Sequence, residues 1–107
     1  MRILIVDDEP NIRRALRVAL EATNHVVAEA ESVPAALAVT EGRTFDLAFL
    51  DLRLRDRSGL ELIAPLLDRN PRLIVIIVTA HASIDTAVEA MRRGAFDYLE
   101  KPFTPAV

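Results

Sequence analysis

Residues 3–8 read Ile-Leu-Ile-Val-Asp-Asp, and this stretch decides the fold: an unbroken apolar run leads directly into two carboxylates. An apolar run without polar alternation is typical of a strand buried on both faces of a parallel sheet. Two more such runs stand at residues 47–50 and 73–78, and the first of these is followed by another acid, Asp51. The chain therefore predicts several buried parallel strands, two of them with acids at their carboxyl ends.

Between these strands, apolar residues recur at the spacing of an amphipathic helix. The four segments begin near Ile12, Val33, Leu60 and Ile84. Gly42 and Gly94 follow the second and fourth segments, where we expect them to cap the helices. Pro65 lies inside the third segment, and because proline lacks the amide hydrogen of a helix interior, we expect a kink or a late helix start there.

Two further strands are predicted at residues 26–30 and 96–99, and we expect them at the sheet edges because Glu29 and Asp97 interrupt their apolar residues. Strands that alternate with helices predict an α/β fold, doubly wound around a five-stranded parallel sheet. The 107 residues are enough for one domain with its own core, so we expect residues 1–107 to form a single domain.

The composition excludes several function classes. The formal net charge of −3 leaves no basic stripe for nucleic acid, and the absence of cysteine excludes disulfides, thiolate metal sites and cysteine nucleophiles. Three glycines form neither a dinucleotide-binding motif nor a phosphate-binding loop. No apolar run is long enough for a membrane span and none has the form of a signal peptide, so we expect a cytoplasmic protein.

The acids after the first and third strands predict a cation site. Ligands of open parallel sheets bind outside the carboxyl ends of the strands, where Asp7, Asp8 and Asp51 would converge. A single aspartate after a strand is often a turn or capping residue. Three adjacent carboxylates repel one another, however, and oxygen ligands of this kind suit Mg²⁺.

Two more polar residues stand at strand ends. Thr79 stands at the end of the fourth predicted strand and offers a hydroxyl, and Lys101 follows the fifth strand and offers an ammonium group. Taken alone, Thr79 is better explained as a helix or turn cap, and Lys101 as a solvated surface charge. Together with three carboxylates and Mg²⁺, Lys101 balances the formal charge, so the set predicts a site for one phosphoryl group.

Residues 3–9, 49–52, 78–80 and 97–103 resemble, in order and spacing, the receiver domain of two-component response regulators. The resemblance implies the flavodoxin-like strand order 2-1-3-4-5. Residues 79–98 are most similar to receivers of NtrC-type transcriptional activators, which implies an output domain, control of transcription and a possible homodimer of the full-length protein. No direct binding of nucleic acid or membrane is expected from this segment.

The resemblance also implies the chemistry of the site. Asp51 would accept a phosphoryl group from a sensor histidine kinase. Asp8, Asp51 and the backbone carbonyl of Arg53 would bind Mg²⁺, with Asp7 acting through water. Thr79 and Lys101 would contact the phosphoryl oxygens.

Further roles follow from the same resemblance. Thr79 and Tyr98 would form a conformational switch, and the side chains of Arg53 and His81 would overhang the acyl phosphate and tune its hydrolysis. Lys101 must turn back toward the acids, and we expect a cis peptide bond before Pro102.

The chain also departs from the family pattern. Arg55 stands four residues after Asp51, where many receivers have proline. Thr104-Pro105 is typical of a helix start, and the family continues with a final helix, so we expect that helix to be truncated and the chain to be cut from a longer regulator.

Two other functions remain open. An aspartyl-phosphate phosphatase usually has a second acid two residues after its nucleophile, but here that residue is Arg53, which cannot act as the general acid and base. A phosphate-independent interaction scaffold would not need the complete polar set at the strand ends. We therefore expect no enzyme activity beyond the domain's own phosphorylation and dephosphorylation.

Overall fold

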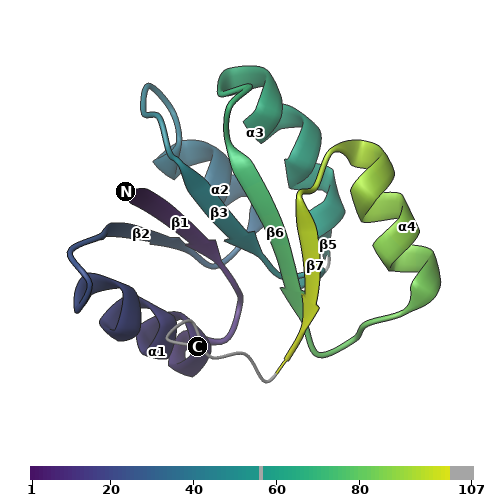
Figure 1. Cartoon of the computed structure of the whole chain (residues 1–107), viewed down its shortest axis with the longest axis horizontal. Coiled ribbons are helices and arrows are strands. Elements are labelled where there is room, and N and C mark those ends of the chain that lie inside the picture. The colour runs from purple at the N-terminus through teal and green to yellow at the C-terminus, as the bar shows by residue number, and fades with distance from the viewer. Residues whose placement is uncertain (56, 102–107) are drawn as a thin grey trace.

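The fold is described by a computed structural model that covers residues 1–55 and 57–101. One twisted sheet runs through the molecule (Figure 1). Its five strands, all parallel, are β1 (Arg2–Val6), β2 (Val26–Ala30), β3 (Leu47–Leu50), β6 (Ile74–Thr79) and β7 (Asp97–Glu100). Their order is β2-β1-β3-β6-β7. Counted within this sheet alone, that order is 2-1-3-4-5, which confirms the doubly wound topology.

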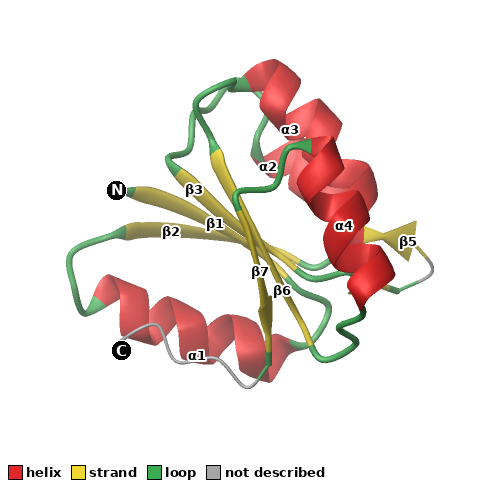
Figure 2. Ribbon diagram, turned by 45° about the vertical axis from the view of Figure 1, so that its right-hand side comes forward, coloured by secondary structure: helices red, strands yellow, loops and turns green. Residues whose placement is uncertain are grey.

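Helices cover both faces of the sheet (Figure 2). Within the described residues, α1 (Pro10–Glu21) lies on one face, and α2 (Val33–Val39), α3 (Ile63–Arg69) and α4 (Ile84–Arg93) lie on the other. Ile3 and Ile5 of β1 pack with the α1 cluster, whereas Leu4 and Val6 pack with the opposite one. Successive strand residues point to opposite faces, so the unbroken apolar run of β1 reflects burial on both sides.

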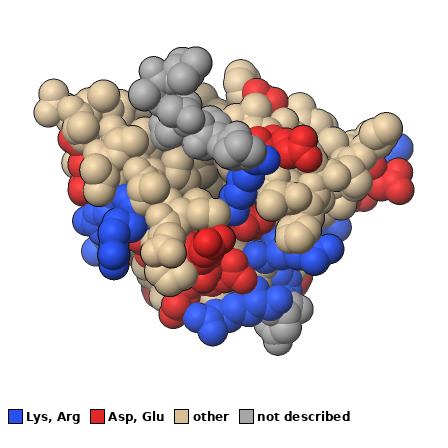
Figure 3. Space-filling view, turned by 90° about the horizontal axis from the view of Figure 1, so that it is seen from below, with Lys and Arg blue, Asp and Glu red and all other residues tan. Residues whose placement is uncertain are grey.

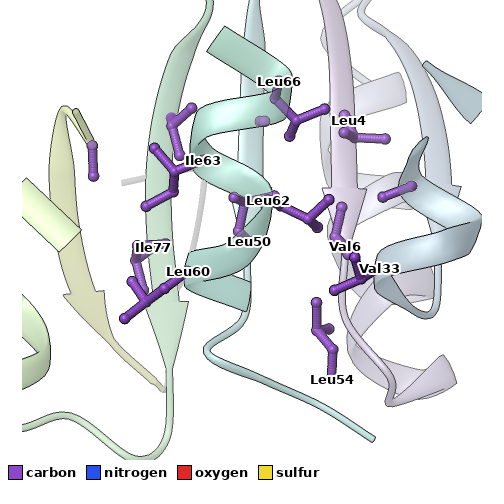
Figure 4. Close-up of a cluster of buried hydrophobic side chains, with 14 of the residues drawn as sticks. Leu4, Val6, Val33, Leu50, Leu54, Leu60, Leu62, Ile63, Leu66 and Ile77 are labelled. Carbon is purple, nitrogen blue, oxygen red and sulfur yellow. The ribbon is translucent and has the colours of Figure 1, made fainter. Parts of the chain in front are cut away.

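The larger cluster joins the sheet to α2 and α3 (Figure 4). Leu62, Ile63 and Leu66 are almost fully buried over the sheet residues Leu50 and Ile77. Apolar burial of this extent, at about 25 cal/mol per Å² removed from water, is the main stabilising term. This packing fixes the positions of the strand ends relative to one another.

The edge strands are the two that were expected. β2 and β7 are the outer strands of the sheet, and each has residues that remain partly exposed. The fourth strand of the sheet, β6, is displaced by one residue from the expected range and includes Thr79. An edge strand has neighbours on one side only, so it tolerates the polar residues Glu29 and Asp97.

The third helix starts late, as Pro65 indicated. A short 3₁₀-helix, η1 (Gly59–Leu62), precedes α3, which begins at Ile63. Pro65 is thus the third residue of α3, and the amides of a first helical turn have no partner within the helix. The missing amide hydrogen therefore costs no hydrogen bond within α3 itself.

The prediction for Gly42 was wrong. α2 ends at Val39, and Thr40 is its C-cap, with a hydroxyl that donates to the Ala36 carbonyl at 2.8 Å. Gly42, with φ of 69°, lies in the turn beyond. Gly94 does cap α4, with φ of 110°.

A small antiparallel hairpin was not predicted. It consists of β4 (Arg53–Leu54) and β5 (Arg57–Ser58) and follows directly after Asp51. Leu54 is buried and anchors the hairpin, whereas Arg55 has a φ of 60° in the turn. Strands of two residues are too short for a periodic pattern to reveal them.

Candidate functional site

The carboxyl ends of four neighbouring strands, β1, β3, β6 and β7, lie at the same end of the sheet. The amide of Asp51 donates to the Val6 carbonyl at 2.9 Å, and the amide of Lys101 donates to the Thr79 carbonyl at 2.9 Å. Viewed toward this end, acidic side chains gather in the middle of the surface with basic side chains beside them (Figure 3). The parallel register therefore brings together residues that are far apart in the sequence.

The three expected acids converge. Asp7, Asp8 and Asp51 each offer a carboxylate oxygen, and these oxygens lie within 4.8 Å of one another. Asp7 and Asp51 are 4% and 7% exposed, while Asp8 is exposed. Hard oxygen ligands at this spacing, two of them shielded from water, fit a divalent cation.

Lys101 joins two of these acids. Its Nζ lies 2.7 Å from Asp7 Oδ2 and 3.0 Å from Asp51 Oδ2. Burial lowers the pKa of this ammonium group, but the hydrogen bonds and charges of the two aspartates outweigh burial, so the pKa is raised. One ammonium group cannot neutralise three carboxylates, and the cluster keeps a negative charge that favours a second cation.

The pKa of Asp7 is raised, with burial as its main cause and the charge of Asp51 as a further one. The Lys101 ammonium and the Glu9 amide both act in the opposite direction without cancelling it. Desolvation of an acid disfavours its charged form. A cation beside Asp7 would therefore stabilise the charged form of its carboxyl group.

Backbone amides orient all three carboxylates. Each amide donates to one oxygen and so fixes the plane of the group. The pairs are Glu9 with Asp7 Oδ1 at 3.0 Å, Arg53 with Asp51 Oδ1 at 3.3 Å, and Arg55 with Asp8 Oδ2 at 3.2 Å. Two of the three donors belong to the hairpin, which thus helps to position the acids.

The other predicted residues lie around this cluster. Thr79 is fully buried at the end of β6, and its Oγ1 accepts a hydrogen bond from the amide of His81 at 3.1 Å. The side chains of Arg53 and His81 are exposed. They line an open groove of about 530 Å³ together with other residues of the hairpin and of the start of α4.

Tyr98 is half-buried in β7, and its hydroxyl is bonded to the start of α4. Its oxygen lies 2.6 Å from Thr86 Oγ1 and accepts from the Ser83 amide at 3.3 Å. In the described part of the chain, the tyrosine hydroxyl is thus engaged with α4 and not with Thr79. Pro102, predicted to follow a cis peptide bond, and Thr104-Pro105 lie outside the described residues.

Gly59 is a site residue that the sequence interpretation missed. A Cβ added there would lie 1.7 Å from the backbone oxygen of Asp51, and the Gly59 amide donates to the Leu52 carbonyl at 2.7 Å. Any side chain would therefore displace the backbone of Asp51. The scarcity of glycine, with three in the whole chain, was the available signal.

Comparisons with known proteins agree with this arrangement. The family described as response regulator receiver domain matches residues 3–107. The alginate biosynthesis transcriptional regulatory protein AlgB of Pseudomonas aeruginosa is 50% identical over 104 residues, which are 97% of this chain and 23% of that protein. The chain thus spans about a quarter of the length of this relative.

Solved structures of response regulators are also similar to this chain. A response regulator from Burkholderia pseudomallei, with a phosphorylated aspartic acid, a calcium ion and citrate, superposes with a TM-score of 0.94 at 37% identity, covering 96% of this chain and 61% of that one. The beryllofluoride-activated NtrC4 receiver domain dimer gives a TM-score of 0.88 at 35% identity, covering 96% and 85%.

The helices of the described residues are all too short or too polar to cross a membrane. The match to the family covers the predicted site, and the sheet order and the clustered acids agree with it. This chain belongs to the response regulator receiver domain family, whose members here include transcriptional regulators.

Proposed function

We propose that this receiver domain acts as a switch controlled by phosphorylation of Asp51, with a sensor histidine kinase as the phosphoryl donor. The observation that carries the proposal is the position of Asp51: its carboxylate is buried at the end of β3, beside two other acids and 3.0 Å from the ammonium of Lys101. A carboxylate placed in this way can act as a nucleophile toward phosphorus.

In the transfer, an oxygen of Asp51 forms a bond to phosphorus while the bond from phosphorus to the donor breaks. The departing group takes that electron pair, and the product is an acyl phosphate on Asp51. The work of the protein is to position the reactants and to stabilise charge on the equatorial oxygens. Lys101 already lies beside the nucleophile, and Thr79 offers a hydroxyl at the neighbouring strand end.

Mg²⁺ is the cation that we assign to the acids. Asp8, Asp51 and the carbonyl of Arg53 would hold it, with Asp7 acting through water. When bound, the ion would supply positive charge to a cluster that Lys101 leaves negative. Support comes from the convergence of the carboxylate oxygens within 4.8 Å.

Thr79 and Tyr98 form the proposed switch. A phosphoryl oxygen would compete for the Thr79 hydroxyl, which now accepts from the His81 amide. The Tyr98 hydroxyl, bonded to Thr86, would leave α4 as the end of β6 moves. Phosphate contacts made in one conformation shift the population toward it. Arg53 and His81, exposed at the rim, would tune the hydrolysis of the acyl phosphate.

The output would be transcription, carried by a further domain of a longer regulator, with a possible homodimer of that regulator. Relatives such as AlgB are transcriptional regulators about four times as long as the matched segment. In these proteins the receiver would be a regulatory domain and not an enzyme with a substrate of its own.

Intact-mass measurement after incubation with Mg²⁺ and acetyl phosphate tests the proposal. We expect one acid-labile phosphate on the wild type and none on Asp51→Asn. Asp68→Asn is the matched control, because Asp68 is an exposed acid on α3 and should leave the adduct unchanged.

The other outcomes contradict the proposal in different ways. Rapid, continuous release of phosphate would identify a phosphatase. A wild type that takes up no phosphate from acetyl phosphate or from a histidine kinase would identify a phosphate-independent scaffold.

A further inference from the structure

One arginine of α1 reaches the backbone of the acidic site. Arg13 Nη1 donates to the carbonyl oxygen of Asp7 at 2.6 Å, and the Arg13 side chain is 15% exposed. This carbonyl belongs to the peptide unit between Asp7 and Asp8. The guanidinium therefore holds the turn that carries two of the three converging acids.

A second contact fixes the guanidinium itself. Arg13 Nε donates to Glu29 Oε1 at 3.3 Å, and the other oxygen of Glu29 accepts from Arg17 Nη1 at 2.8 Å. Glu29 is in β2, the edge strand beside β1. The side chain of Arg13 is thus clamped between an edge strand and the acidic turn, in a geometry that the planar fork of arginine suits and a lysine does not.

We infer that Arg13 is a positioning residue for the acidic site: its bond to the Asp7 carbonyl holds Asp7 and Asp8 in the arrangement that binds a cation. The inference rests on the proposed Mg²⁺ site. Groups that orient metal ligands from outside the coordination sphere commonly change metal affinity by about 10–100-fold when removed. Arg13 holds the backbone of the turn, not a carboxylate oxygen, so the lower end of that range is expected.

The sign of the effect separates positioning from simple electrostatics. Arg13 carries a positive charge close to the acids, so a purely electrostatic role predicts that its removal strengthens Mg²⁺ binding. Positioning predicts the opposite, because the two acids lose their fixed turn. A role in stability alone predicts no change in Mg²⁺ affinity of the folded protein.

The experiment measures the Mg²⁺ dissociation constant by calorimetry for the wild type, Arg13→Gln and Arg14→Gln, at a temperature where circular dichroism shows each to be folded. Arg14 is the matched control, since it is the next residue of α1 and is exposed. We expect Arg13→Gln to bind Mg²⁺ about tenfold more weakly, and Arg14→Gln to bind it as tightly as the wild type or slightly more tightly.

Arg13→Lys gives a second test at constant charge and serves if Arg13→Gln does not fold. It should weaken binding less than Arg13→Gln does, because an ammonium group can restore one of the two contacts. Mg²⁺ binding by Arg13→Gln as tight as by Arg14→Gln, or by Arg13→Lys as tight as by the wild type, would overturn the inference.

A metal-free readout separates this inference from the proposed function. The Glu9 amide donates to Asp7 Oδ1 at 3.0 Å, so its hydrogen exchange, followed by NMR, reports the order of the turn. We expect faster exchange in Arg13→Gln and no change in Arg14→Gln. If the wild type binds no Mg²⁺, the proposed site fails, while unchanged Glu9 exchange in Arg13→Gln would refute the positioning role.

Discussion

At the scale of single residues, Lys101 is the cation that makes two buried carboxylates tolerable. Its ammonium group contacts both Asp7 and Asp51. Lys101→Met keeps a similar volume but leaves these acids without their shared partner. We expect a loss of about 2–3 kcal/mol in the free energy of unfolding without metal, since removal of one member of a buried charged pair costs this much or more. Urea unfolding in a chelating buffer measures it.

The stabilisation of this variant by Mg²⁺ is a further test. Because the ion replaces part of the lost positive charge, it should stabilise Lys101→Met more than it stabilises the wild type. Equal stabilisation of the two proteins would contradict the view that lysine and metal share the same acids.

Gly59 is a second residue whose replacement is expected to affect both the stability of the fold and the phosphorylation of Asp51. Its missing side chain leaves room for the backbone oxygen of Asp51. Gly59→Ala should lower the free energy of unfolding by about 1–3 kcal/mol, the usual range for overpacking, and should slow phosphorylation because Asp51 is displaced. Urea unfolding and intact-mass time courses check the two effects.

Gly42→Ala is the matched control. Gly42 has a positive φ but open space around it, so alanine there costs about 1 kcal/mol of backbone strain and leaves the phosphorylation rate unchanged. Equal phosphorylation rates in the two variants would show that Gly59 does not position Asp51.

At the scale of elements, the start of η1 depends on a capping box. The Ser58 hydroxyl accepts from the amides of this turn, and Glu61 accepts from the Ser58 amide at 3.1 Å and from Arg57 at 2.9 Å. These contacts hold the pKa of Glu61 below its usual value, with the hydrogen bond from Arg57 as the main cause and the one from the Ser58 amide as the second. A lowered folded-state pKa contributes stability above the unfolded-state value, and that contribution disappears as pH falls through the folded-state value.

Glu61→Gln should therefore melt below the wild type at pH 7, and the difference should shrink once the pH falls below about 4, near the usual pKa of glutamate. Glutamine keeps one acceptor oxygen for the Ser58 amide, but its NH2 group cannot accept from Arg57. Part of the difference is therefore independent of pH, and the pH-dependent part reports the charge. A difference in melting temperature that stays constant from pH 7 to pH 3 would contradict this explanation.

At the scale of the whole molecule, cation binding should raise the stability of the entire fold, because the acids follow two different strands of one sheet, β1 and β3. A ligand present at one hundred times its dissociation constant stabilises by about 2.7 kcal/mol. We expect Mg²⁺ to raise the melting temperature of the wild type by several degrees in a thermal shift assay.

Asp8→Asn tests the origin of that shift. It removes one of three mutually repelling charges, so the metal-free protein should melt at a higher temperature while its response to Mg²⁺ decreases. A metal-free melting temperature below that of the wild type would contradict electrostatic crowding at the site.

The sequence determined most of this arrangement by itself. The unbroken apolar runs of β1, β3 and β6 predict strands buried on both faces, and helical spacing between them predicts the alternating fold. Asp7, Asp8, Asp51, Thr79 and Lys101 were all identified by their places at strand ends. These features could be predicted because the burial of a strand and the position of polar residues at its end are local properties, which the residue pattern encodes directly.

The tertiary structure alone decided how these parts meet. Four features are of this kind: the hairpin after Asp51, the space that Gly59 leaves for Asp51, the bond of Tyr98 to α4, and the position of Arg13 between Glu29 and Asp7. No periodic pattern in the sequence marks any of these contacts. Such contacts depend on the packing of one element against another, so their partners follow from the distances in the fold and not from spacing along the chain.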